Sequence, residues 1–166
     1  MGCLGVHFAL SEKEVLELRS QPDDASRLEQ LQEEIEETYF EEHPELLAEN
    51  DKAWDAIHRT LTDGKLSWEN GKYPLNHVIM GGESLYSKDD YIISLKTPKQ
   101  VQDIATALPS VTESDFRKRY YAIDKSYGSP LSEEDFGYTW EYFQSVKELF
   151  LRAASENRYV LFTADQ

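Results

Sequence analysis

Cysteine is nearly absent from this sequence of 166 residues, which contains only Cys3. A single cysteine excludes a disulfide within the chain and any zinc site built from several cysteines. Proteins that lack disulfides are typical of reducing compartments, so we expect this protein in the cytoplasm. The Cys3 thiol lies on an expected strand without a local base, which favours a buried or incidental thiol over a nucleophile.

Long hydrophobic runs are also missing. No stretch approaches the roughly 18 apolar residues of a membrane-spanning helix. The opening MGCLGVHFALSEKE has no positively charged leader, and its apolar run is too short for a signal peptide. The Met1-Gly2-Cys3 start hints at acylation, but Val6 stands where the myristoylation pattern requires Ser or Thr. A strand beginning near Leu4 is the favoured interpretation.

Positive charge is scarce, with 17 Lys and Arg residues against 32 Asp and Glu residues and a formal net charge of −15. This balance argues against binding to nucleic acid or to an anionic membrane surface, both of which require a basic footprint. Between Gln21 and Asn50, eleven acidic residues and one basic residue, Arg27, carry −10 of the total. The composition therefore favours a basic protein partner.

The motifs of common enzymes and metal sites are missing too. The sequence contains no H-E-x-x-H motif, no Cys/His zinc spacing and no G-x-S-x-G elbow for a serine nucleophile. The GGESL segment at 81–85 lacks the Lys-Ser/Thr pair of a phosphate-binding loop and the spacing of a dinucleotide fingerprint. We expect a glycine turn there, and neither a cofactor nor a metal.

What is present is an irregular alternation of helix and strand signals in a chain that is 40% hydrophobic, enough to fill one core. Strands are predicted at 6–10, 77–80, 91–95 and 158–164. Helices are predicted after Ser11, from Ser26 to Glu42, from the cap Asn50 to about Leu61, after Thr97, after Thr112 and along the stripe from Phe136 to Ala153. We expect an α+β fold in a single domain, residues 1–166, with a small mixed or antiparallel sheet of about four strands packed with about six helices.

The segment DKAWDAIHRTL at 51–61 is the first candidate site. At 100° per residue, Trp54 and His58 share one helical face, with Asp51 and Asp55 on its shoulder. A carboxylate beside an imidazole can orient the ring or tune its pKa, which makes Asp51, Asp55 and His58 a candidate acid/base or metal trio. The alternative is a hydrogen-bonded histidine at the edge of the core. His7 and His77 could also lie on neighbouring strands.

The predicted helix from Ser26 to Glu42 is the second candidate site. Its apolar positions, at Leu28, Leu31, Ile35 and Tyr39, follow helical spacing. Like charges recur every four residues without an interleaved cation, which weakens an isolated helix by about 0.2–0.5 kcal/mol per pair. The aromatic Phe40 projects away from the apolar stripe. The candidate partner-binding residues are Glu29, Glu33, Glu36, Glu37, Phe40 and Glu41. The alternative is a solvated acidic face with Phe40 packed under the next loop.

Four segments resemble a known family: MGCLGVHFAL, DKAWDAIHRTLTDG, YPLNHVIMGGESL and YIISLKTPKQVQDIATAL. They are similar in order and spacing to DUF1877, or YfbM-like, proteins, a family of small bacterial proteins, although the usual third residue of that family, Met, is Cys3 here. The resemblance covers nearly the whole chain. It implies an α+β domain of bacterial origin and no established catalytic residues.

Two classes of function remain open. One is a non-catalytic binding protein, most concretely an immunity or antitoxin protein that neutralises a basic toxin domain by occluding it. The other is an uncharacterised enzyme that uses His58 with Asp51 or Asp55, with His77 and Tyr91 as further candidates. The concentrated negative charge favours the binding protein, because the acidic helix has no role in the enzyme.

Overall fold

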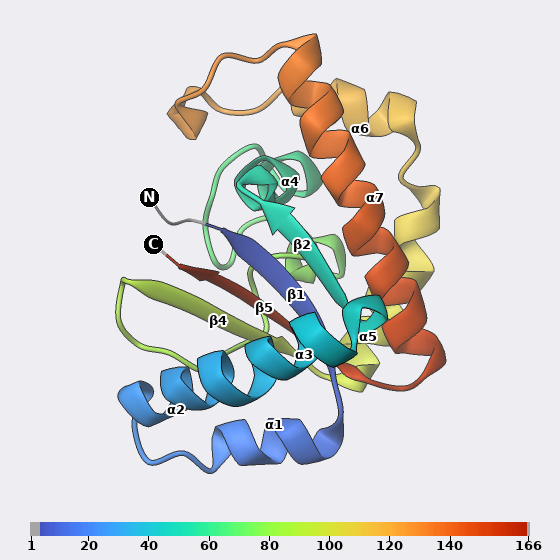
Figure 1. Ribbon diagram of the computed structural model, residues 1–166. Helices are drawn as coiled ribbons and strands as arrows, with labels where there is room; N and C mark the ends of the chain where they lie inside the picture. Colours follow the sequence, from blue (N-terminus) through green and yellow to red (C-terminus); the bar gives the residue numbers. More distant parts are fainter. Residues whose placement is uncertain (1–3, 166) are drawn as a thin grey trace.

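A five-stranded antiparallel sheet forms the centre of the protein, as the computed structural model, which describes residues 4–165, shows (Figure 1). The strands are β1 (Gly5–Leu10), β2 (Leu47–Asp51), β3 (Glu83–Ser84), β4 (Tyr91–Lys96) and β5 (Tyr159–Asp165). Their order across the sheet is β2-β1-β5-β4-β3, and every neighbouring pair is antiparallel. The expected α+β class is confirmed. The sequence did not predict β2 or the short β3.

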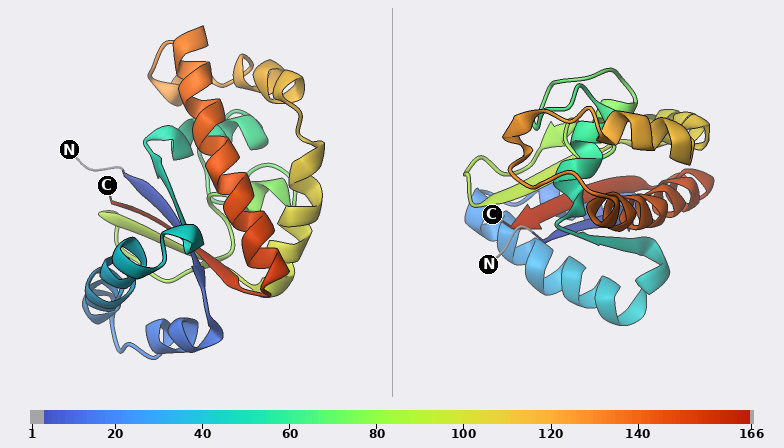
Figure 2. Two further views of the ribbon diagram at one scale, coloured as in Figure 1. Left: turned by 45° about the vertical axis from the view of Figure 1, so that its right-hand side comes forward. Right: turned by 90° about the horizontal axis from the view of Figure 1, so that it is seen from above.

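Helices cover both faces of this sheet (Figure 2). They are α1 (Glu12–Arg19), α2 (Asp24–Gln30), α3 (Glu37–Glu42), α4 (Ala53–Leu61), α5 (Pro98–Ala107), α6 (Glu113–Tyr120) and α7 (Glu133–Ser155). Side chains of successive strand residues point to opposite faces. On one face, the Phe8 ring lies edge-on to Tyr39 of α3, and on the other the His7 ring lies edge-on to Phe150 of α7. Adjacent residues of β1 thus pack against different helices.

The helix starts follow the capping chemistry of the sequence. Ser11 and Thr97 each form both halves of a capping box, with Glu14 and Gln100 respectively. The Thr112 side chain caps α6 with a single bond, which it accepts from the Asp115 backbone N–H. The predicted apolar stripe of α7 is buried at Phe136, Phe143, Val146, Phe150 and Ala153, while Trp140 is half-buried. In the described part of the chain, no helix is both long enough and apolar enough to cross a membrane.

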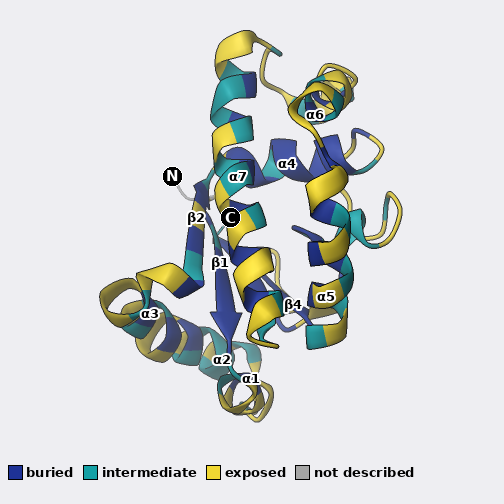
Figure 3. Cartoon of the chain, turned by 90° about the vertical axis from the view of Figure 1, so that its right-hand side faces the viewer, coloured by how far each residue is buried: buried dark blue, intermediate teal, exposed yellow. Residues whose placement is uncertain are grey.

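Burial is unusual in α4, where Asp55 is the only residue that is not buried (Figure 3). The sequence predicted one inner face for this segment. Instead, α4 lies between β2, α6 and α7, and even Arg59 and His58 are buried. This helix is therefore a core element.

Two local predictions are wrong, and a third is confirmed with a change in its middle. Asn50 does not cap α4, because it lies in β2 and its side chain binds His7; Lys52 is the residue before the helix. Residues 77–80 form no strand: a 3-10 turn (Leu75–His77) leads into a buried loop. The helix predicted from Ser26 to Glu42 is helical from Asp24 onward, but its middle is a π-helix (Leu31–Glu36). The thiol and acylation predictions concern Met1, Gly2 and Cys3, which lie outside the described residues.

The turn before β3 makes Gly82 a sensitive position. Its φ is +72°, and an added Cβ would lie 2.4 Å from the Leu95 carbonyl oxygen. We expect Gly82→Ala to lower the free energy of unfolding by about 1–3 kcal/mol. Gly137 in α7 has nothing within 4 Å of its Cβ position, so Gly137→Ala should raise that free energy by about 0.5–1 kcal/mol. Urea unfolding of both variants checks this, and equal effects of the two substitutions would contradict it.

Candidate functional site

The acidic helix presents an outward row of carboxylates. Glu29, Glu33, Glu37 and Glu41 are all exposed. Within residues 4–165, none of the four forms an ion pair with a lysine or arginine. A π-helix makes i→i+5 bonds and has a wider turn, so positions four apart stay closer to alignment along the helix axis than in an α-helix. The row of like charge is thus maintained along the helix.

Glu36 and Phe40 face a different direction from that row. Glu36 is half-buried and accepts a hydrogen bond from the Tyr91 hydroxyl at 3.1 Å. Burial raises the pKa of Glu36, and the nearby Asp165 carboxylate raises it further, while the Tyr91 hydrogen bond acts in the opposite direction. The ring of Phe40 meets Phe8 edge-on at 6.3 Å yet is still 43% exposed. The structure therefore separates the six candidate binding residues into two groups.

A groove of about 1690 Å³ lies where Glu36 and Phe40 point. Its floor comes from β1, β2 and β5 with Tyr91 of β4, and its two walls come from the helix at residues 32–40 and from α7. In Figure 2, these two walls stand on either side of the strands. The carboxylates that line the groove are Glu36, Glu45, Glu49, Asp51, Glu148 and Asp165. The only guanidinium in this lining is that of Arg152.

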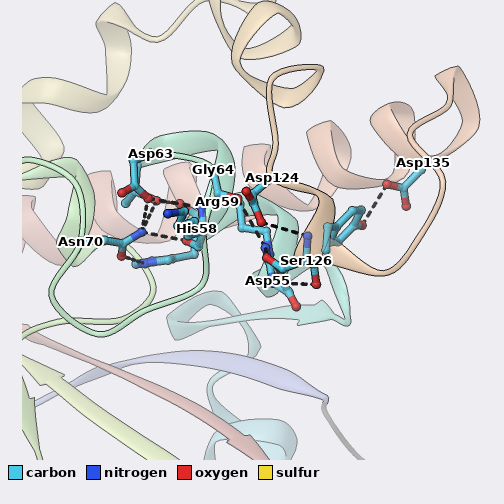
Figure 4. Close-up of polar contacts among 12 residues, drawn as sticks. Asp55, His58, Arg59, Asp63, Gly64, Asn70, Asp124, Ser126 and Asp135 are labelled. Carbon is cyan, nitrogen blue, oxygen red and sulfur yellow. Dashed lines mark hydrogen bonds and ion pairs between the residues drawn. The ribbon is translucent and has the colours of Figure 1, made fainter.

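The predicted trio of Asp51, Asp55 and His58 is not assembled. Asp51 ends β2 and lines the acidic groove. Asp55 pairs with Arg59, its Oδ1 lying 2.5 Å from the guanidinium Nε. His58 points the other way, with Nε2 2.8 Å from the side-chain oxygen of Asn70 (Figure 4). Burial lowers the pKa of His58, and Lys96 lowers it further, while the Asn70 hydrogen bond opposes both.

The contacts of these residues hold loops in place. The amide nitrogen of Asn70 donates to Asp63, Thr62 and the Lys65 carbonyl, so His58 and Asn70 together close the loop that follows α4. On the other side of α4, the Arg59 Nη1 atom donates to the Ser126 hydroxyl at 2.8 Å. Among the described residues, no group of three or more His, Cys, Asp or Glu side chains is arranged to hold a metal ion.

A set of buried bases lies on the sheet face that packs against the 77–82 loop. Lys96 is fully buried, and its Nζ atom donates at 2.5 Å both to the Ile79 carbonyl and to the Ser94 hydroxyl. The His7 ring lies 2.8 Å from the Val78 carbonyl through Nε2 and 2.8 Å from the Asn50 amide nitrogen through Nδ1. Sequence reasoning missed Lys96. The available signal was a lysine at the end of the apolar strand YIISLK.

Burial governs the protonation of these bases. It lowers the pKa of Lys96 well below its usual value. It also lowers the pKa of His7 to about 3, with help from Lys96 and against the Val78 hydrogen bond. His77 is not on a strand beside His7, as the sequence suggested it could be, but in the Leu75–His77 turn, where burial and Lys96 lower its pKa. These groups lie inside the fold, away from the acidic groove.

The buried His7 makes stability depend on pH. Its pKa in the unfolded chain is about 6.5, and its pKa in the folded protein is about 3. Between these values the unfolded chain binds a proton that the folded protein does not, so the free energy of unfolding falls as the pH falls, by up to about 1.4 kcal/mol per pH unit. His7→Gln keeps a hydrogen-bonding side chain but cannot titrate. We expect its stability to fall less steeply than that of the wild type from pH 6.5 to 4.5 in urea titrations, and equal slopes would contradict this assignment.

Comparison with known proteins agrees with the fold. A solved structure described as that of a protein of unknown function, YfbM from Escherichia coli, superposes with a TM-score of 0.69 and 19% sequence identity. The alignment covers 97% of this chain and 99% of that one. No curated protein matches this chain. The sequence pattern of a domain of unknown function, DUF1877, matches residues 1–163. This chain therefore belongs to the DUF1877 family.

Proposed function

We propose that this protein is a non-catalytic acidic binding protein, most concretely a bacterial immunity or antitoxin protein that neutralises a basic toxin domain by occluding it. The observation that carries the proposal is the groove, which six carboxylates and a single guanidinium line. The exposed row of Glu29, Glu33, Glu37 and Glu41 lies on the helix that forms one wall. A basic protein surface is the chemistry that complements both features.

The exposed row would act on the rate of encounter. Charges that face solvent raise the local concentration of an oppositely charged partner and accelerate association, and salt screens the effect. Like charges spaced four residues apart also weaken the free helix by about 0.2–0.5 kcal/mol per pair. A cationic partner removes that repulsion, so the helix gains stability when the partner binds.

Occlusion requires no chemistry from the bound protein. An inhibitor that covers a basic active surface excludes the substrate, and apolar contacts in the interface set how long it stays bound. The proposal includes the cytoplasm as the place of action, because a chain with one cysteine suits a reducing compartment. Catalysis by Asp55 and His58 finds no comparable support, since Arg59 and Asn70 already engage these side chains.

The steering role is tested by charge removal. We expect a variant with Glu29, Glu33, Glu37 and Glu41 all changed to Gln to associate about tenfold more slowly with the basic partner at low salt. The partner is first isolated by retention on the tagged protein from its own host's lysate at low and high salt, and is identified by mass spectrometry. Stopped-flow mixing of the purified pair then gives the association rate constant. The difference between the variant and the wild type should shrink at high salt.

A matched control separates local from overall charge. Glu12, Glu69, Glu134 and Glu141 are exposed and lie outside the groove, so their joint replacement by Gln changes the net charge equally. The control should keep most of the wild-type association rate. Equal slowing by both variants would remove the acidic helix from the encounter surface. The proposed function fails if the lysate yields no basic protein that binds this chain and if this chain reduces the activity of no basic toxin domain.

A further inference from the structure

The size of the acidic groove indicates what kind of occupant it takes. Pockets for small molecules and cofactors have volumes of about 300–1,000 Å³. The groove measures about 1690 Å³. Residues of four strands line it, and two separate helices border it. These dimensions suit a segment of polypeptide.

The groove is also where exposed apolar side chains gather. Six large hydrophobic side chains are exposed in the described part of the chain, and three of them line this groove. They are Leu4, Phe40 and Leu151, which are 51%, 43% and 39% exposed. They come from the residue before β1, from the helical wall and from α7, so they are far apart in sequence but line one groove. Exposed apolar side chains gathered around one groove are typical of an interaction site.

Charge and apolar surface alternate around the groove. Along the helical wall, Gln32, Glu36 and Phe40 follow one another at intervals of four residues. Along α7, Glu148 lies beside Leu151. The one cation, Arg152, already has Glu156 as a partner at 3.7 Å, so it offsets little of the negative charge of the lining. An occupant that complements this lining carries cations and apolar side chains together.

From these features we infer that the groove binds a single basic, amphipathic segment of the partner protein, with lysine or arginine side chains interleaved with apolar ones. The apolar side chains of the segment pack on Phe40 and Leu151, and its cations reach Glu36 and Glu148. The Glu36 carboxylate gains from such a cation, because it is half-buried and has no ion pair among the described residues. This inference rests on the proposed function and narrows it to one segment of the partner.

A second copy of this chain is a poorer occupant. Its most basic exposed stretch is in α6, but two of the three cations there are already paired, Arg117 with Glu133 and Arg119 with Asp115. Two copies would also bring net charges of −15 together. A basic partner with unpaired cations would neither have to break ion pairs nor repel this chain through its net charge.

The test uses three fluorescently labelled peptides of about 16 residues and the full-length protein. The first alternates pairs of Lys or Arg with Leu so that one side is apolar. The second is a scramble of the same composition, and the third keeps the Lys and Arg but replaces Leu by Ser. We expect the first peptide to bind at least tenfold more tightly than the third in fluorescence anisotropy at physiological salt. Similar binding of the two would show that charge alone acts, and would overturn the amphipathic segment.

Variants of the protein locate the binding. Phe40→Ser and Leu151→Ser remove exposed apolar side chains from the groove, while Leu16→Ser removes one on α1 that is 56% exposed and outside it. We expect each groove variant to weaken binding of the first peptide about tenfold, and Leu16→Ser to leave it unchanged. Glu36→Gln and Glu148→Gln should weaken binding, in contrast to Glu12→Gln. Circular dichroism confirms that each variant is folded.

The outcomes separate this inference from the proposed function. If the isolated basic partner binds and the groove variants bind it as tightly as the wild type, the groove is not the site, while the acidic binding protein stands. If neither the partner nor any basic peptide binds, both proposals fail. A dimer of the wild type in sedimentation velocity that Phe40→Ser dissociates would assign the groove to a second copy and overturn the inference.

Discussion

The fold depends on how the 77–82 loop, which has no strand partner, is buried against the sheet with its backbone carbonyls hydrogen-bonded. Val78, Ile79 and Gly81 are buried, yet no neighbouring strand pairs with this part of the backbone. A buried carbonyl without a hydrogen bond is costly, so side chains must take the place of the missing strand. His7 donates to the Val78 carbonyl and Lys96 donates to the Ile79 carbonyl. The Ser94 hydroxyl donates to the Gly81 carbonyl at 2.5 Å.

These three donors come from β1 and β4, which flank β5 in the sheet. The loop is therefore held across the sheet at two strands that are far apart in sequence. Because the donors are buried, the uncharged forms of His7 and Lys96 are favoured.

The acidic surface has a cost that the core offsets. Repulsion along the helix at residues 24–42 opposes its formation, and that helix gains its stability from packing, with Leu31, Ile35 and Tyr39 buried. The Tyr39 hydroxyl also donates to Glu14 at 2.6 Å and to the Ala9 carbonyl at 3.1 Å. The same helix thus has one face that holds it to the sheet and another that stays open to solvent, with the groove between it and α7.

Local chemistry in the sequence determined much of this fold. Capping boxes at Ser11 and Thr97, the stripe of α7 and the apolar runs of β1, β4 and β5 are short-range signals, since their hydrogen bonds and periodicity involve residues a few positions apart. The polar strand β2, LAEND, escaped prediction, because its pattern carries no strand propensity and its register comes from pairing with β1.

Only the tertiary structure decided the partners of the polar residues. The sequence placed Asp55 and His58 on one helix, but Asp55 pairs with Arg59 one turn on and His58 binds Asn70 in the loop that follows the helix. The fold of that loop decides the contact of His58. The sequence showed an acidic helix but not the groove, since Glu36, Asp51 and Glu148 meet only when the helix, β2 and α7 assemble. Composition determined the amount of negative charge. The fold determined its concentration around the groove, because long-range packing alone brings those three carboxylates together.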